Sequence, residues 1–165
     1  MSMETESITA RALDERAAAR VTASFERQGF MRHIRARIVR LAAGFCEIHV
    51  PHQAELTQQH GFFHGGIIGT LADNAGGYAA YTLMPPDASI LTVEFKVNLL
   101  APGDGDLLIG RSRVTRRGRT LSVCHSQVFV RKAGEEQLCA EGLVTLMALP
   151  GRPDEPAGRK PIPID

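Results

Sequence analysis

The segment from Ile67 to Leu83 constrains the fold more than any other part of the chain. It is long, and Asp73 is its only charged side chain. A helix that is apolar on nearly every side must be enclosed by other elements rather than laid on a surface. The stretch 64–81 also holds five glycines, each of which costs a helix about 1 kcal/mol relative to alanine. We therefore expect the backbone of this helix to approach a sheet or a ligand closely.

The segments around this helix have the hydrophobic patterns of one further helix and six strands. Residues 8–28 show the spacing of an amphipathic helix, with Gly29 as its stop. Alternation from Phe30 to Val50, broken at 43–44, predicts a hairpin. Four more strands are expected at 88–101, 105–117, 119–132 and 136–149, separated by turn sequences. Strict alternation in the first of these places Thr92 on the face opposite Phe95.

This element order predicts an α+β fold in which a curved antiparallel β-sheet wraps around a central α-helix, with an extra N-terminal helix. We expect a single domain over 8–149, because the chain has 165 residues and no internal repeat. Residues 1–7 are polar and are expected to be flexible. Residues 150–165 hold five of the nine prolines, which is typical of an extended tail.

Composition excludes several classes of function. The net charge is +1 and aromatic residues make up only 5%, which argues against a nucleic-acid partner. No apolar run is long enough to span a membrane, and the first residues do not resemble a signal peptide. Three scattered cysteines without C-x-x-C spacing indicate reduced thiols, so we expect a cytoplasmic protein. His60 and His64 are four residues apart, but no Glu accompanies them, and we expect no metal site.

Asp73 is the first candidate for chemistry. Burying a carboxylate is unfavourable unless it is paired or hydrogen-bonded, and such groups often have shifted pKa values at functional sites. The alternative is that the sequence from Thr70 to Asp73 is a capping box, with the helix beginning at residue 70 and Asp73 in solvent.

Gly65 and Gly66 are the second candidate, because they come just before the apolar run. A helix N-terminus offers free N–H donors, and without side chains a substrate carbonyl could approach them, as in an oxyanion hole. The alternative is a Gly-Gly turn that only bends the chain. Gly65 and Asp73 are eight residues apart, or about 12 Å along a helix at about 1.5 Å per residue. If both act on one substrate they must come from different chains, which predicts an isologous dimer.

The motif from His64 to Asp73, HGGIIGTLAD, resembles that of hotdog-fold acyl-CoA thioesterases of the PaaI (phenylacetate-degradation) type. The sequence RGRT at 117–120 and the final strand segment AEGLVT at 140–145 resemble the same group, so that the likeness covers roughly residues 30–149. It implies the hotdog fold, dimers that often pair into tetramers, and hydrolysis of an acyl-CoA to carboxylate and free CoA without cofactor or metal.

Positions that match the family carry its functional residues. The resemblance implies that Asp73 is the nucleophile or the general base for water, and that Gly65 N–H of the partner chain polarises the thioester carbonyl. His64, counted with the catalytic residues, would hold the turn that precedes the helix and touch the substrate near its carbonyl. The family often has an Asn six residues before this His, where Gln58 keeps an amide on a longer side chain. A Ser or Thr on the strand after the helix often orients water, and Thr92 is the candidate here.

Substrate binding is expected to involve five further residues. Gly66 and Asn74 lie beside the two catalytic candidates in the sequence. CoA carries three phosphates and therefore needs cations near the mouth of its pocket. Arg117 and Arg119 flank Gly118 in a turn and could supply them, although a solvated hairpin tip is the alternative. Phe62, Phe63, Tyr78 and Tyr81 suggest aromatic surfaces near the pocket without fixing the acyl group.

Two other functions remain open at this point. A dehydratase of the same fold would use His64 as a base on a 3-hydroxyacyl thioester. A non-catalytic acyl-CoA-binding protein would keep the pocket and the arginines, but a pocket that only binds acyl chains gains nothing from a buried charge.

Overall fold

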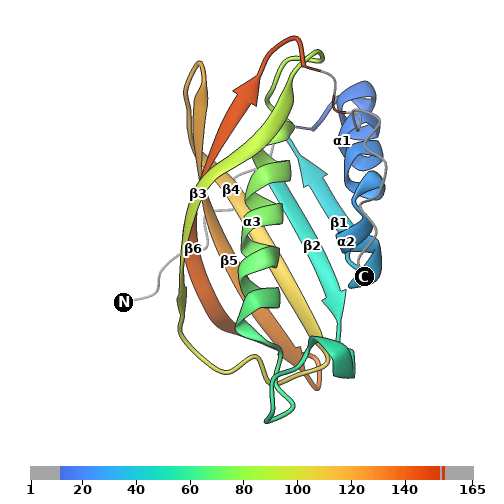
Figure 1. Ribbon diagram of the computed structural model, residues 1–165, viewed down its shortest axis with the longest axis vertical. Helices are drawn as coiled ribbons and strands as arrows, with labels where there is room; N and C mark the ends of the chain where they lie inside the picture. Colours follow the sequence, from blue (N-terminus) through green and yellow to red (C-terminus); the bar gives the residue numbers. More distant parts are fainter. Residues whose placement is uncertain (1–11, 153, 155–165) are drawn as a thin grey trace, which may run out of the picture.

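The computed structural model describes residues 12–152 and Asp154 (Figure 1). Six strands form one antiparallel sheet in the order β1-β2-β4-β5-β6-β3. The strands are β1 (Arg37–Ala42), β2 (Phe45–Pro51), β3 (Ser89–Leu99), β4 (Leu107–Arg117), β5 (Leu121–Lys132) and β6 (Glu135–Leu149). The helices are α1 (Glu15–Arg27), α2 (Gly29–His33), the 3₁₀ turn η1 (Ala54–Leu56) and α3 (Gly65–Tyr81).

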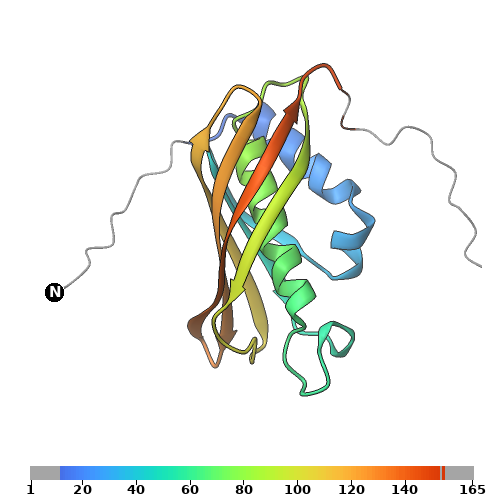
Figure 2. The ribbon, with the colours of Figure 1, turned by 60° about the vertical axis from the view of Figure 1, so that its left-hand side comes forward.

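The sheet curves around α3, so the predicted fold class is confirmed (Figures 1 and 2). Leu71, Ala72 and Ala75 of the helix are fully buried against the concave face of the sheet. Gly76 marks one close approach, because a Cβ at this position would lie 3.0 Å from Cβ of Val144 on β6. The expected close approach of helix backbone to sheet therefore occurs at this glycine.

Helix α1 packs against α3 on the side away from the sheet (Figure 1). Val21 and Phe25 form its buried face. Arg20 fixes it to the end of α3, because its guanidinium donates to the carbonyl oxygens of Tyr81 and Met84, both at 3.0 Å, and stacks on the Tyr81 ring. The Tyr81 carbonyl belongs to the last turn of α3 and also accepts from Met84 N–H, so Arg20 ties α1 to the turn that ends α3.

The N-terminal region differs from the prediction. The helix expected over 8–28 begins at Glu15, where Asp14 caps it by accepting from Arg16 N–H at 2.8 Å. Residues 8–11 lie outside the described residues. Gly29 does not end the helical region but starts α2, and β1 begins only at Arg37. The apolar residues after Gly29 form one helical turn. In a stretch this short, the spacing of apolar residues does not show whether a helix or a strand will form.

Near the centre of the chain, the structure excludes one alternative and contradicts one expectation. Helix α3 begins at Gly65, so Asp73 lies in mid-helix and no capping box starts at Thr70. A bulge in β3 between Thr92 and Glu94 breaks the strict alternation. It turns Thr92 toward the helix, on the same face as Phe95, rather than the opposite one.

Strand β3 is an edge of the sheet, because it pairs only with β6. Four apolar side chains of β3 are exposed, and so is that of Leu100, which directly follows the strand. The four in β3 are Leu91, Val93, Phe95 and Leu99. An apolar edge strand of this length is a template for pairing with another chain. The predicted tail at 150–165 falls mostly outside the described residues.

Within the described part of the chain, no helix is long and apolar enough to cross a membrane. Cys46, Cys124 and Cys139 are all buried and form no disulfide, which agrees with the reduced thiols expected from the sequence.

We predict opposite effects of alanine at two adjacent glycines of α3. Gly76→Ala should lower the free energy of unfolding by about 1–3 kcal/mol, because its Cβ must displace Val144 in a packed core. Gly77→Ala should raise it by about 0.5–1 kcal/mol, since the nearest atom to its Cβ is 3.9 Å away and alanine favours a helix. Urea unfolding at one protein concentration measures both. Equal changes in the free energy of unfolding for the two variants would show that the helix is not tightly packed against the sheet at Gly76.

Candidate active site

Asp73 lies on α3, half-buried, where the helix faces β3. The Thr92 hydroxyl donates to Asp73 Oδ1 at 2.8 Å. Burial raises the pKa of Asp73 above its ordinary value, and the hydrogen bond from Thr92 opposes part of this increase. A carboxylate that is poorly solvated and held by one hydroxyl is suited to act as a base or nucleophile.

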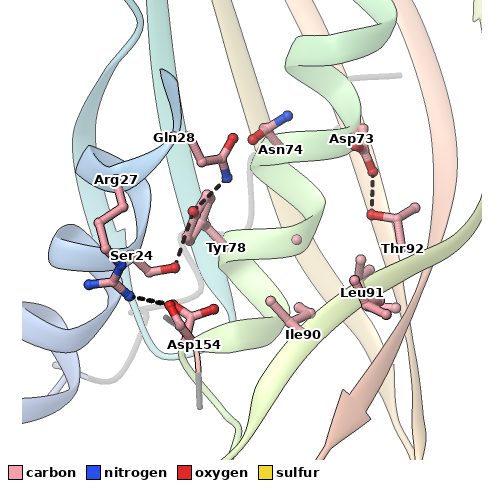
Figure 3. A pocket seen from close by; sticks show the side chains of 12 residues that line it. Ser24, Arg27, Gln28, Asp73, Asn74, Tyr78, Ile90, Leu91, Thr92 and Asp154 are labelled. Carbon is pink, nitrogen blue, oxygen red and sulfur yellow. Dashed lines mark hydrogen bonds and ion pairs between the residues drawn. The ribbon is translucent and has the colours of Figure 1, made fainter. Parts of the chain in front are cut away.

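A cavity of about 390 Å³ opens beside Asp73 (Figure 3). Its walls come from α1, α3 and the first half of β3, together with Leu146 and Asp154. It is lined by Ser24, Arg27, Gln28, Asp73, Asn74, Gly77, Tyr78, Ile90, Leu91, Thr92, Leu146 and Asp154. Asn74 contributes an amide that donates to the Thr70 carbonyl oxygen at 3.1 Å.

The N-terminus of α3 forms a second group. His64 is the N-cap, and its Nδ1 accepts from Gly66 N–H at 2.9 Å. Gly66 N–H is therefore used by the cap. Among the described residues, no acceptor lies within hydrogen-bonding distance of Gly65 N–H, as is usual for the first turn of a helix. This donor sits at the positive end of the helix dipole.

Gln58 lies close to this helix start. Gln58 and Gly65 both line a cavity of about 480 Å³, together with Phe62 and Phe63. The Gln58 side-chain oxygen accepts from His60 N–H, so the amide shapes the turn that leads to α3. The two phenylalanines thus lie near the predicted site.

The structure does not bring all the predicted residues together in one chain. Asp73, Thr92 and Asn74 form one group, while Gln58, His64, Gly65 and Gly66 form another at the start of the same helix. Because α3 is continuous from Gly65 to Tyr81, about 12 Å of helix separates Gly65 from Asp73. An open groove lined by Gly65, Gly66, Gly69, Thr70, Phe95, Val97 and Leu99 runs between the two groups.

The predicted phosphate-binding residues form a third group, beyond the C-terminus of α3. Arg117, Gly118 and Arg119 line a cavity of about 370 Å³ with Leu83 and Met84. Both arginines are exposed. Among the residues that the structure describes, neither has a carboxylate partner.

Sequence reasoning missed the contribution of α1 to the site. Ser24 and Gln28 reach the cavity beside Asp73, and Gly77 forms part of its floor. Gly77 follows Asp73 by four residues and therefore shares its helix face, a signal that was available in the sequence. Tyr81 lies instead beside Arg20, outside this cavity.

In 12–152 and at Asp154, no three His, Cys, Asp or Glu side chains are grouped in a way that could hold a metal ion. His60 and His64 belong to the loop and helix cap described above.

Comparisons with known proteins agree with one another. A profile of the thioesterase superfamily matches residues 60–137. A protein of Halobacterium salinarum named as an esterase is 31% identical over 117 residues, which is 68% of this chain and 77% of that protein. The crystal structure of a thioesterase family protein from Silicibacter pomeroyi has a TM-score of 0.81 and 46% identity, over 82% of this chain and 99% of that one. The E. coli PaaI protein from the phenylacetic acid degradation operon shares the fold, with a TM-score of 0.76 and 19% identity over 85% and 98% of the two chains.

We predict that Thr92→Val raises the pKa of Asp73 further, because it removes the hydrogen bond that stabilises the ionised carboxylate while burial persists. An NMR titration of the Asp73 carboxyl carbon measures this directly. Thr92→Ser keeps the hydroxyl and serves as the control, with a pKa close to that of the wild type. A lower pKa in the valine variant would contradict the assigned roles of burial and hydrogen bonding.

Proposed function

The chain belongs to the thioesterase superfamily and is a thioester hydrolase, and we propose that it hydrolyses an acyl-CoA to a carboxylate and free CoA. The proposal rests on one observation above all. A partly desolvated carboxylate, Asp73, lines one cavity. A helix N-terminal donor, Gly65 N–H, lies about 12 Å away at the start of the same helix, where it borders an open groove that leads toward Asp73.

Asp73 supplies the reactive group. As a general base its carboxylate takes a proton from water as the water attacks the thioester carbonyl; as a nucleophile it attacks the carbonyl itself. Burial raises its pKa and hence its basicity. Thr92 holds Oδ1 at 2.8 Å, which leaves Oδ2 for the water or substrate.

Gly65 N–H of a second copy supplies the oxyanion donor. One carbonyl cannot lie about 3 Å from both Asp73 and Gly65 of the same helix, given a separation of about 12 Å. Antiparallel pairing of two α3 helices places Gly65 of each chain near Asp73 of the other. Two features support this dimer: the apolar edge of β3, and glycines at 65, 66 and 69 that allow close approach.

The alternatives are less well supported. His64 Nδ1 accepts from Gly66 N–H, so a neutral His64 carries its proton on Nε2 and offers no free lone pair. A dehydratase would need that lone pair as its base. A purely binding protein would gain nothing from the desolvation of Asp73.

We assign the phosphates of CoA to Arg117 and Arg119. Both are exposed, and no carboxylate among the described residues pairs with them. They lie at the opposite end of α3 from the Gly65 of their own chain. In the antiparallel pairing the partner's Gly65 lies opposite Asp73, which is eight residues, or about 12 Å, before this end of the helix.

A subunit-mixing experiment tests the shared site. Asp73→Asn and Gly65→Pro should each lower kcat by at least about 100-fold as homodimers. Proline is tolerated at the first helical position, and His64 already has the extended backbone that a following proline requires. Random exchange should make half of the dimers mixed, each with one intact site. The mixture should therefore recover about one quarter of the wild-type activity.

Gly65→Ala is the matched control, because it adds the same Cβ near Leu99 but keeps the N–H. It should retain most of the activity. A mixture that stays inactive after verified exchange would show that Asp73 and Gly65 do not act across two chains.

We also predict that Arg117→Gln with Arg119→Gln raises KM for an acyl-CoA about tenfold or more with little change in kcat, because charge-assisted bonds to phosphate are lost. The corresponding acyl-pantetheine thioester lacks those phosphates and should be hydrolysed equally by both proteins. An unchanged KM for acyl-CoA would place the nucleotide elsewhere.

A further inference from the structure

We propose that the cavity beside Asp73 selects acyl groups that carry a neutral oxygen acceptor, such as a hydroxyl, away from the thioester, and that the Tyr78 hydroxyl binds this oxygen. The inference rests on the proposed function and adds the class of acyl group. It assigns α1 a part in substrate recognition.

The proton of the Tyr78 hydroxyl makes no short hydrogen bond within the described residues. Tyr78 is only 4% exposed, and its oxygen accepts from Gln28 Nε2 at 2.7 Å. The other neighbour, Ser24 Oγ, lies at 3.4 Å, which is long for a bond between two hydroxyls. A nearly buried hydroxyl beside a cavity therefore has a proton available for an acceptor on a ligand.

The cavity connects this donor to the reactive carboxylate. Figure 3 shows Ser24, Gln28 and Tyr78 together on the α1 side, away from the Asp73–Thr92 pair. Gly77 lies between the two groups on α3, and a Cβ there would meet only Leu146 Cδ1, at 3.9 Å. The missing side chain keeps the floor of the cavity open along the path from Asp73 to Tyr78.

The charges around the cavity favour a neutral group. Arg27 is its only cationic lining residue, and Arg27 Nη2 already donates to both Asp154 Oδ2 at 2.7 Å and the Asp154 carbonyl oxygen at 2.8 Å. Asp73 and Asp154 contribute two carboxylates. A phosphate or a second carboxylate entering this cavity would find no unpaired cation among the lining residues, so the acyl end rather than the nucleotide occupies it.

A structural role for the same contacts makes a different prediction. Tyr78 also packs edge-on against Phe25 of α1, with ring centroids 5.3 Å apart. Tyr78→Phe keeps this ring contact and removes only the hydroxyl. If the hydroxyl merely fixed α1, its loss would change the hydrolysis of all acyl groups by the same factor.

The test compares kcat/KM for matched acyl-CoA substrates: hexanoyl, 6-hydroxyhexanoyl and adipoyl, and 3-phenylpropanoyl with its 4-hydroxyphenyl counterpart. Wild-type protein should prefer the hydroxylated member of a pair by about tenfold, the value of one good hydrogen bond. Adipoyl-CoA, which ends in a carboxylate, should be poorer than hexanoyl-CoA. Tyr78→Phe should reduce the preference to within about twofold.

Tyr81→Phe is the matched control, because it removes a hydroxyl from the next tyrosine of α3, which does not line this cavity. It should leave the preference unchanged. Equal hydrolysis of both members of each pair by the wild type, or the same preference in Tyr78→Phe, would overturn the inference while leaving the thioesterase proposal intact.

Calorimetric binding of the same thioesters to Asp73→Asn separates the two proposals further. Tighter binding of hydroxylated acyl-CoAs that disappears in Asp73→Asn/Tyr78→Phe would support the inference even if the wild type hydrolysed none of them. Absence of hydrolysis would then count only against the proposed function. Absence of any acyl preference in binding would count against the inference.

Discussion

Gly65 and Asp73 lie on one unbroken helix, and an α-helix fixes the distance between its residues. The helix places an available N–H donor at its start and a half-buried carboxylate about 12 Å further along. Gly65 lines an open groove between α3 and β3, and Asp73 lines the cavity further along the same helix. The proposed hydrolysis needs an oxyanion donor and a base or nucleophile at one carbonyl. In the proposed dimer, the groove, the apolar edge of β3 and the glycines of α3 are parts of one arrangement that a second copy completes.

The surroundings of α3 explain why the pKa of its carboxylate is raised. The curved sheet and α1 exclude water from most of the helix, and this burial raises the pKa of Asp73. The glycines of the helix have different structural roles. Gly76 lets the helix approach β6, whereas Gly77 leaves space in the cavity and Gly65 presents its N–H at the helix start.

Much of this architecture could be predicted from the sequence. An almost uncharged segment required an enclosed helix, and alternating strands separated by turn residues supplied the sheet. The spacing of Gly65 and Asp73 in the sequence also predicts that a site using both groups needs two chains. The reason is that helix geometry is regular, so distances along it follow from sequence alone.

The features that the sequence does not predict depend on long-range packing, which local sequence patterns do not encode. The bulge that turns Thr92 toward Asp73 arises from the pairing of β3 with β6. The short helix α2 replaced an expected strand because tertiary contacts decide between helix and strand in short apolar runs. Ser24 and Gln28 belong to the site only because α1 packs beside α3, a juxtaposition that follows from the whole fold.

A crystal structure of the dimer with a non-hydrolysable acyl-CoA analogue would measure the arrangement directly. The decisive quantity is the distance from the analogue's carbonyl region to Asp73 of one subunit and to Gly65 N of the other. We expect both to be about 3–4 Å, the reach of an attacking group and of an oxyanion donor. A carbonyl that meets Asp73 and Gly65 of the same subunit, or neither glycine, would contradict the account.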